Sequence, residues 1–279
     1  MKRASFIVPV AACAIIAAAL FSCKGKNAAN DKTAKDSTKT TSQALVPGGY
    51  MKLDSSKRYI FLTFDDSPQP PGTTVCKAIF HANGVKATFF AVGMHQFDYY
   101  RKMVVDSIRN AYPEFLLANH SYSHGFQNNY KKFYASPDSA VSDFIRAEAE
   151  MKVPVKIIRL PGNNSWVFKG AEMKGPKSTM QVCKRLDSLG YSVVGWDIEW
   201  QFVGGSKPKQ SVEEMLKEVN NKFDNMTSNY PNTVVILAHD RMFAKQPYSD
   251  SLNKFIGALK ADPRNAFETI DHYPLIHKK

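Results

Sequence analysis

From about residue 51 onward, short apolar segments of strand length alternate with helix-like segments, and this alternation restricts the fold more than any other feature. Between Val212 and Phe223, for example, apolar residues recur at i, i+3, i+4, i+7 and i+11, the spacing of one helix face. Repeated strand–helix units predict a parallel sheet with helices outside it. The strand candidates are residues 59–64, 87–92, 115–118, 155–159, 191–196, 234–238 and 267–270.

Seven strands with about six helices predict a single-domain α/β barrel that is one unit short of eight. Glycines follow the ends of two predicted helices, at Gly84 and Gly190, as expected for left-handed helix caps. The segment after residue 51 contains no internal repeat and no composition shift that would indicate a second domain.

Unusual polar residues stand at the carboxyl ends of the predicted strands. In a parallel barrel these ends face one mouth, where catalytic groups gather. The sequence therefore predicts that side chains far apart in the chain meet at one site. They are Asp65 and Asp66 after the first strand, His120 and His124 after the third, Arg159 at the end of the fourth, Asp197 and Glu199 after the fifth, and His239 after the sixth.

These residue types favour metal-assisted hydrolysis. Two histidines four residues apart with one carboxylate form an open zinc site, and a second carboxylate and another histidine supply a base and an acid. Each element has an ordinary alternative: an Asp-Asp pair in a turn, a His-x-x-x-His on a solvated helix face, or a surface arginine at Arg159. The combination at one rim favours a catalytic site.

Five motifs, in order and with plausible spacing, resemble those of the polysaccharide deacetylases, the NodB-homology group or carbohydrate esterase family 4. The resemblance covers about Met51 to the C-terminus and implies a distorted (β/α)7 barrel that removes acetyl groups from N-acetylated, sometimes O-acetylated, sugars. It also implies a divalent metal cofactor, usually zinc. The motifs are Thr63-Phe64-Asp65-Asp66, Ala87-Thr88-Phe89-Phe90, Asn119-His120-Ser121-Tyr122-Ser123-His124, Arg159-Leu160-Pro161 and Leu237-Ala238-His239-Asp240.

The resemblance also implies roles for single residues. Asp65 would be the general base, tethered by Arg159, and His239 would be the acid that protonates the departing amine. The metal ligands would be Asp66, His120 and His124, while Leu237 would line the pocket for the acetyl methyl and the Gly162 N–H would help to hold the oxyanion.

The chain departs from the family pattern at three places. Ser67 replaces the usual glycine, and Gly162 stands where many members carry an aromatic residue. The acid motif Trp196-Asp197-Ile198-Glu199-Trp200 is compressed, so either Asp197 or Glu199 could raise the pKa of His239, and Asp197 is preferred. Trp196 and Tyr122, like Trp166 and Trp200, would stack on sugar faces or pack in the core or rim.

The N-terminus predicts export. Lys2 and Arg3 precede an apolar segment of residues 6–21, and Leu20-Phe21-Ser22-Cys23 resembles a bacterial lipobox. We expect residues 1–22 to be a lipoprotein signal peptide, residues 23–50 a lipidated Cys23 with a disordered tether, and residues 51–279 the catalytic domain. The alternative is an uncleaved N-terminal anchor. Either predicts membrane attachment at the cell envelope of a bacterium, as a periplasmic or outer-membrane-anchored lipoprotein.

Charge and cysteine usage limit the partners. The formal charge is +12, but the lysines are scattered and no nucleic-acid-binding signature accompanies them, so no nucleic-acid partner is expected. Cys76 and Cys183 have no metal-type spacing. We expect buried free thiols, with a disulfide as the alternative.

The expected function is metal-dependent hydrolysis of the acetamide of N-acetylhexosamine residues in a polysaccharide or oligosaccharide, such as peptidoglycan or a chitin-like chain, with release of acetate. The enzyme would be a hydrolase of linear amides whose partner is an acetylated glycan. The alternatives are an O-acetyl esterase for plant polysaccharides such as xylan, and a glycan-binding lipoprotein that has lost catalysis.

Overall fold

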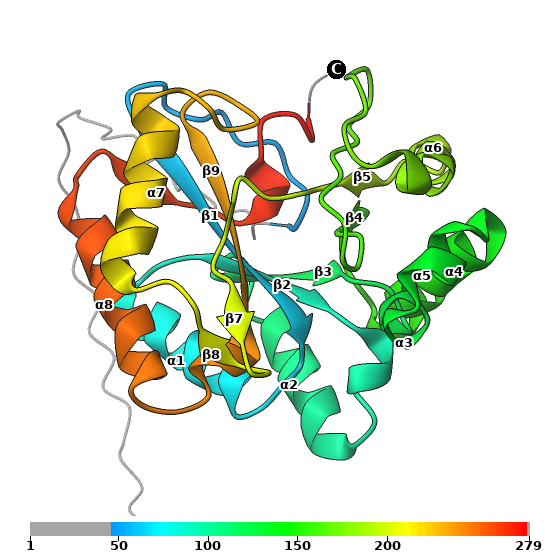
Figure 1. The fold of residues 1–279 in the computed structure, drawn as a ribbon, viewed down its shortest axis with the longest axis horizontal. Coiled ribbons are helices and arrows are strands. Elements are labelled where there is room, and N and C mark those ends of the chain that lie inside the picture. Colours follow the sequence, from blue (N-terminus) through cyan, green and yellow to red (C-terminus); the bar gives the residue numbers. More distant parts are fainter. Residues whose placement is uncertain (1–45, 278–279) are drawn as a thin grey trace, which may run out of the picture. The chain divides into compact units, whose positions relative to one another are not determined.

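The computed structural model describes residues 46–277, and strand β1 (Arg58–Ser67) lies at the centre of its sheet (Figure 1). Every residue of β1 after Arg58 is buried. Strand β2 (Ala87–Ala91) pairs with it on one side and strand β9 (Thr233–His239) on the other, both in parallel. Because β1 is covered on both faces and both edges, its apolar run reads as continuous rather than alternating.

The main sheet is parallel and curled. Its strands follow the order β5-β4-β3-β2-β1-β9-β6, and β10 pairs with the start of β1. Within the described residues the path is open between β5 and β6, which makes a half-barrel and confirms the predicted distorted (β/α)7 barrel in a single domain. The other strands are β3 (Phe115–Asn119), β4 (Ile157–Ile158), β5 (Ser192–Val193), β6 (Ile198–Glu199) and β10 (Asn265–Phe267).

The predicted strands differ from the observed ones mainly near the opening. The last strand was expected over 267–270, but β10 ends at Phe267, and Ile270 begins the 3-10 turn η4 (Ile270–His272). Strand β6 and the small antiparallel hairpin β7 (Phe202–Val203) with β8 (Lys207–Pro208) were not predicted. Strands of two residues are too short to produce a recognisable pattern.

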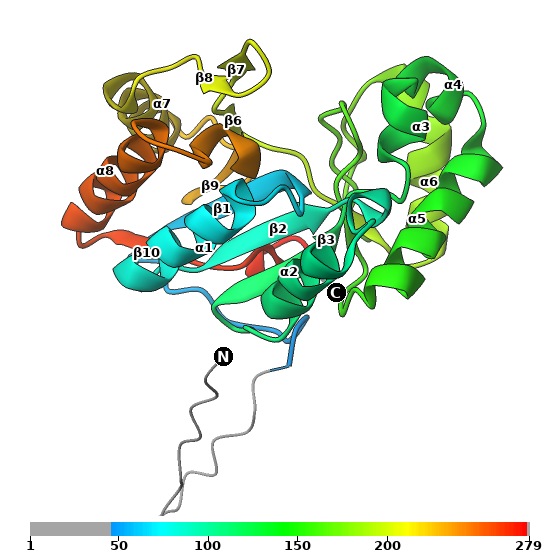
Figure 2. The same cartoon turned by 90° about the horizontal axis from the view of Figure 1, so that it is seen from below.

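Helices cover the sheet in groups. Helices α7 and α8 lie beside β9 and β6, whereas α3 to α6 gather beside β4 and β5 (Figure 2). None of the helices in the described part of the chain is both long and apolar enough to cross a membrane. The helices are α1 (Gly72–Asn83), α2 (Tyr99–Arg109), α3 (His124–Asn128), α4 (Tyr130–Tyr134), α5 (Pro137–Met151), α6 (Met180–Ser188), α7 (Val212–Asp224) and α8 (Tyr248–Ala261), with 3-10 turns η1 (Gly93–His95), η2 (Lys177–Thr179) and η3 (Asp240–Phe243).

Local sequence explains where the best-predicted helix begins. Ser211 precedes α7 and accepts a hydrogen bond from the Glu214 backbone N–H, while the Glu214 carboxylate accepts one from the Ser211 N–H. This capping box satisfies two N–H groups that the first turn leaves unpaired. The predicted apolar face is then buried through Val212, Met215 and Val219.

The core has two parts, one around β1 and α1 and the other among α4, α5, α6 and the strands β4 and β5. Cys76 lies in the first and Cys183 in the second, and both are free and buried. The prediction of buried free thiols is therefore confirmed. The predicted signal peptide and most of the predicted tether, including Cys23, lie outside the described residues.

Candidate active site

An irregularity at the end of β1 creates the site. Along a regular strand, the side chains of Asp65 and Asp66 would point to opposite faces. The pairing register with β2 shifts between Asp65 and Ser67, and Asp66 has a φ of 69°. This bulge allows both carboxylates to line one cavity. The Ser67 hydroxyl donates to Asp240 Oδ2 at 2.7 Å, so the serine that replaces the family's glycine has a structural partner.

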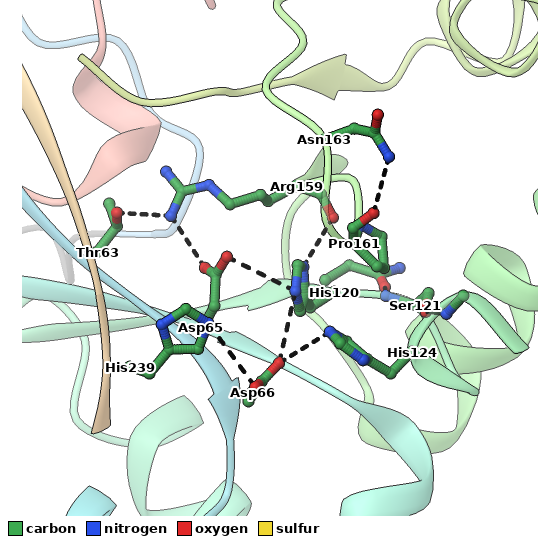
Figure 3. A network of polar contacts seen from close by, with 12 residues as sticks. Thr63, Asp65, Asp66, His120, Ser121, His124, Arg159, Pro161, Asn163 and His239 are labelled. Atoms are coloured by element: carbon green, nitrogen blue, oxygen red, sulfur yellow. Dashed lines mark hydrogen bonds and ion pairs between the residues drawn. The ribbon is translucent and has the colours of Figure 1, made fainter. Parts of the chain in front are cut away.

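Arg159 holds the first of these carboxylates. Its fully buried guanidinium donates from Nη1 to Asp65 Oδ1 at 2.9 Å and to Thr63 Oγ1 at 2.6 Å (Figure 3). Nε and Nη2 donate to the backbone carbonyls of Val194 and Gly195 at 3.3 and 2.8 Å. Burial raises the pKa of Asp65, and the charge of Arg159 opposes that rise. Arg159 thus lies where the predicted tether of a general base must lie.

Asp66, His120 and His124 converge on one point. One nitrogen or oxygen atom from each lies within 4.8 Å of the others, and no other such group of three potential ligands occurs in residues 46–277. His124 Nε2 lies 3.0 Å from Asp66 Oδ1, and His120 Nε2 lies 3.7 Å from it. Asp66 Oδ1 is buried, yet it accepts no hydrogen bond from any described residue. This donor set fits a zinc ion that keeps an open position.

Hydrogen bonds at Nδ1 orient the rings of both His120 and His124. His120 Nδ1 lies 2.9 Å from the Arg159 backbone carbonyl, and His124 Nδ1 lies 2.6 Å from Asn128 Oδ1. Because a carbonyl oxygen only accepts, each Nδ1 must carry the hydrogen, and each Nε2 keeps its lone pair for a metal. Tyr130 donates its hydroxyl to the same Asn128 Oδ1 at 2.9 Å, which fixes the amide in turn.

The pKa shifts of two of the three potential ligands, His120 and Asp66, favour their metal-binding forms. Burial, with the nearby His124 charge, lowers the pKa of His120 to about 3, so this imidazole is neutral at physiological pH. Burial alone would raise the pKa of Asp66, but contact with His124 and the charge of the protonated His124 hold it well below its ordinary value. The same contact outweighs burial at His124 and raises the pKa of that imidazole. A neutral imidazole and an ionised carboxylate are the forms that bind a metal.

The backbone around these ligands is strained. Asp66, Ser121 and His124 have φ values of 69°, 70° and 51°, in the left-handed region that non-glycine residues seldom adopt. Such conformations persist where the surrounding structure enforces them, and they concentrate at functional sites. The strain here falls on two of the three potential ligands.

His239 lies at the end of β9, directly beside Asp65 in the strand register. Its Nε2 is 3.8 Å from Asp66 Oδ2, and its Nδ1 is buried without a hydrogen-bond partner among the described residues. Burial lowers the pKa of His239, while the charges of Asp66 and Asp65 act in the opposite direction. The imidazole therefore lies next to both carboxylates in the wall of the cavity (Figure 3).

The prediction that Asp197 pairs with His239 is wrong. Asp197 Oδ1 accepts from the Asn229 N–H at 2.6 Å and Oδ2 accepts from the Val235 N–H at 2.8 Å, so both oxygens fasten the chain to β9 and the segment before it. Glu199, the alternative, lines the cavity instead. Burial and the charge of Asp65 raise the pKa of Glu199, and Arg159 opposes them.

These side chains enclose a cavity of about 400 Å³ at the carboxyl ends of the strands. Three of the four predicted substrate-binding residues, Gly162, Leu237 and Trp196, line it. A Cβ at Gly162, whose φ is 65°, would lie 2.6 Å from the Tyr130 ring, so this position requires glycine. Tyr130 thus places an aromatic ring against the backbone of Gly162, at the wall of the cavity.

The prediction that Tyr122 binds the substrate is wrong. Its ring packs between Gly93 and the guanidinium of Arg146, which lies 3.4 Å from the ring centroid, and it does not line the cavity. Trp166 and Trp200 are also core residues: Trp166 stacks on Tyr273, and Trp200 is buried. For these three rings, the packing alternative holds.

Among the cavity residues that sequence reasoning missed, two contact Asp66. His95 Nδ1 lies 2.7 Å from the Asp66 backbone carbonyl, and Arg241 donates from Nη1 to Asp66 Oδ2 at 2.7 Å. His95 follows β2 by four residues and Arg241 follows His239 by two, so the rule that selected the other residues could have included both. Arg241 is fixed by a bond from Nε to the Gly205 carbonyl and by stacking over Phe202.

Comparison with known proteins agrees with this geometry. Residues 52–164 match the family model of the polysaccharide deacetylases. The matched span contains Asp65, the three potential metal ligands and Arg159, whereas Glu199 and His239 lie beyond it. No curated protein gives a significant sequence match to this chain.

Solved structures extend the likeness to the whole fold. The catalytic domain of a peptidoglycan N-acetylglucosamine deacetylase from Eubacterium rectale has a TM-score of 0.57 and 22% identity, over 81% of this chain and 95% of that one. A Streptococcus mutans CE4 esterase gives 0.58 and 23%, over 76% and 86%. A family 4 carbohydrate esterase from Streptomyces lividans, solved with acetate, gives 0.52 and 21%, over 78% and 95%. The family match and the shared fold confirm the resemblance to the polysaccharide deacetylases.

Proposed function

We propose that this protein hydrolyses the acetamide of N-acetylhexosamine units in a polysaccharide or oligosaccharide and releases acetate. The observation that carries the proposal is the convergence of three potential metal ligands beside an arginine-tethered carboxylate and a separate imidazole in one cavity. A glycan-binding protein has no need of a base and an acid side by side in one cavity. The match to the deacetylase family supports the same reaction class.

Asp65 and His239 each carry out one of the two proton transfers. A water oxygen attacks the acetamide carbonyl carbon while Asp65 accepts the water proton, and Arg159 orients Asp65 and favours its ionised form. The carbon–nitrogen bond then breaks while His239 gives a proton to the leaving nitrogen. The products are acetate and a free amino sugar, so one water is consumed for each acetyl group removed.

Asp66, His120 and His124 would hold a divalent cation, for which zinc is our proposal because imidazole nitrogen and carboxylate oxygen suit it. When bound, the cation would polarise the acetamide carbonyl and lower the pKa of water. The Gly162 N–H would donate to the carbonyl oxygen as it becomes negative, and Leu237 would pack against the acetyl methyl. We propose that Glu199, and not Asp197, is the carboxylate that raises the pKa of His239.

We also propose that the protein works at the bacterial cell envelope, attached to a membrane through a lipid on Cys23. The support is the sequence alone: a short basic start, an apolar segment and a lipobox-like tetrapeptide before a polar tether. The acetylated glycan partners of such a protein would lie outside the cytoplasm.

Acetate release from a panel of acetylated glycans tests the proposed function. Purified protein loaded with zinc should release acetate from chito-oligosaccharides or peptidoglycan, should lose this activity on chelation, and should regain it when zinc is restored. Release from acetylated xylan without release from any N-acetylated glycan would contradict amide hydrolysis and identify an esterase. Glycan binding with metal present and no acetate from any substrate would identify a binding protein.

A further inference from the structure

A second cavity of about 280 Å³ adjoins the catalytic cavity. The two share Gln69, His95 and Arg241 in their walls, so whatever fills one lies next to whatever fills the other. The remaining wall is formed mainly by the prolines of segment 68–71, by Phe97 and by Arg101. The cavity therefore combines an apolar surface with a few hydrogen-bond donors, the composition typical of small-ligand sites.

Exposed apolar side chains concentrate in residues 97–103, a segment that contributes Phe97 and Arg101 to the wall of the second cavity. In the described residues ten large apolar side chains are exposed, and four of them lie within residues 97–103. Phe97 is 73% exposed, Tyr99 78%, Tyr100 54% and Met103 49%. Single exposed apolar residues are ordinary, but several in one short segment that also lines a cavity favour a binding surface.

Phe97 is fixed in place for such a role. The Arg101 guanidinium stacks on its ring at 4.3 Å and is itself paired with Asp98, whose carboxylate also accepts the Arg101 backbone N–H at 2.8 Å at the start of α2. One face of the ring is thus supported by the protein, while most of the side chain remains in solvent. A rigid aromatic ring loses little conformational freedom on binding.

From these observations we propose that the second cavity binds the sugar unit next to the acetylated one, with Phe97 as its stacking platform. The C–H face of a pyranose ring is apolar and gains from burial against an aromatic ring, while its hydroxyls can accept hydrogen bonds from Arg101, Arg241 and Gln69. The inference rests on the proposed function for the position of the first sugar.

Chain-length dependence tests the assignment. For Phe97→Ala we expect the ratio of kcat/KM on the N-acetylglucosamine pentamer to that on the monomer to fall about five- to tenfold through a higher pentamer KM, the loss of one aromatic stacking contact. Phe97→Trp, which keeps a ring face, should restore the ratio. Tyr50→Ala removes an equally exposed aromatic ring from a different cavity, near the starts of β1 and β9, and should leave the ratio unchanged.

Calorimetric binding of the same pentamer separates this inference from the proposed function. In an Asp65→Asn background, where turnover is prevented, adding Phe97→Ala should weaken pentamer affinity by the same factor. Weaker binding without acetate release by the unmodified protein would support the subsite and contradict the proposed reaction. Equal pentamer affinity with and without Phe97, or an unchanged chain-length ratio, would overturn the subsite even if acetate is released.

Discussion

Asp65→Asn is expected to lower kcat for acetate release by about 10²- to 10⁴-fold, the usual contribution of a general base. The amide keeps the shape of the carboxyl group, and its oxygen can still accept from Arg159 Nη1, as Asp65 Oδ1 does at 2.9 Å. The change therefore removes the proton acceptor while leaving the fold and the three potential metal ligands in place. Initial rates of acetate formation measure the loss, and zinc affinity measured in parallel should be retained.

Asp224→Asn provides the matched control. Asp224 is an exposed residue at the end of α7 and pairs with Arg58, at the opposite end of β1 from Asp65. Its loss should leave kcat within about a factor of two, because Asp224 lies away from the cavity. The fold should also be kept, because exposed ion pairs contribute little to stability. An Asp65→Asn protein that is folded, binds zinc and keeps full activity would refute the role assigned to the base.

Arg159→Met is expected to lower the free energy of unfolding by about 3–5 kcal/mol, the typical cost of removing one partner from a buried ion pair. Arg159 is fully buried and donates to Asp65, to Thr63 and to two backbone carbonyls, all of which would lose a donor. Activity should also fall, because the loss of the Arg159 charge raises the pKa of Asp65 further and favours its protonated form. Urea unfolding of the apo-protein measures the stability change.

The stability deficit of Arg159→Met, meaning its loss in free energy of unfolding, should depend on pH with a defined sign. Burial raises the pKa of Asp65, and removing Arg159 takes away the charge that opposes this rise. An acid whose folded pKa exceeds its unfolded pKa loses its proton first in the unfolded state, so stability falls as pH rises from the unfolded value toward the folded one. The deficit of Arg159→Met should therefore be smaller near pH 4 than at pH 8.

A double variant tests whether the uncompensated charge of Asp65 causes the stability deficit of Arg159→Met. Asp65→Asn in the Arg159→Met background removes the uncompensated carboxylate, so it should recover part of the lost stability at pH 8 and reduce the pH dependence of the deficit. A deficit that is equal at pH 4 and pH 8, with no recovery in the double variant, would contradict a coupling between Asp65 and Arg159.

The sequence was most informative where one geometric rule applies. Carboxyl ends of parallel strands meet at one edge, so the meeting of Asp65 with His239 followed from the strand pattern alone, and the register pairs them directly. The convergence of Asp66 with His120 and His124 followed from the same rule and from the motifs. The bulge that turns Asp66 beside Asp65 carries no sequence signal apart from the two adjacent acids.

Prediction from sequence failed where the position of a side chain depended on the backbone path of a short segment. Asp197 and Glu199 are two residues apart, and the sequence does not show that Asp197 is held by the N–H groups of Asn229 and Val235. Strand β6, which pairs Glu199 with Leu237, has two residues and no periodicity to recognise. Tyr130 reaches the cavity across Gly162 from a separate helix, a contact that tertiary structure alone establishes.

Anomalous diffraction from crystals soaked with zinc can locate the metal among its three proposed ligands. We expect one strong peak in the cavity, about 2.0–2.2 Å from a carboxylate oxygen of Asp66 and from Nε2 of His120 and of His124. A fully soaked crystal with no peak among these three side chains, or with its zinc held elsewhere in the protein, would contradict the metal site on which the proposed hydrolysis depends.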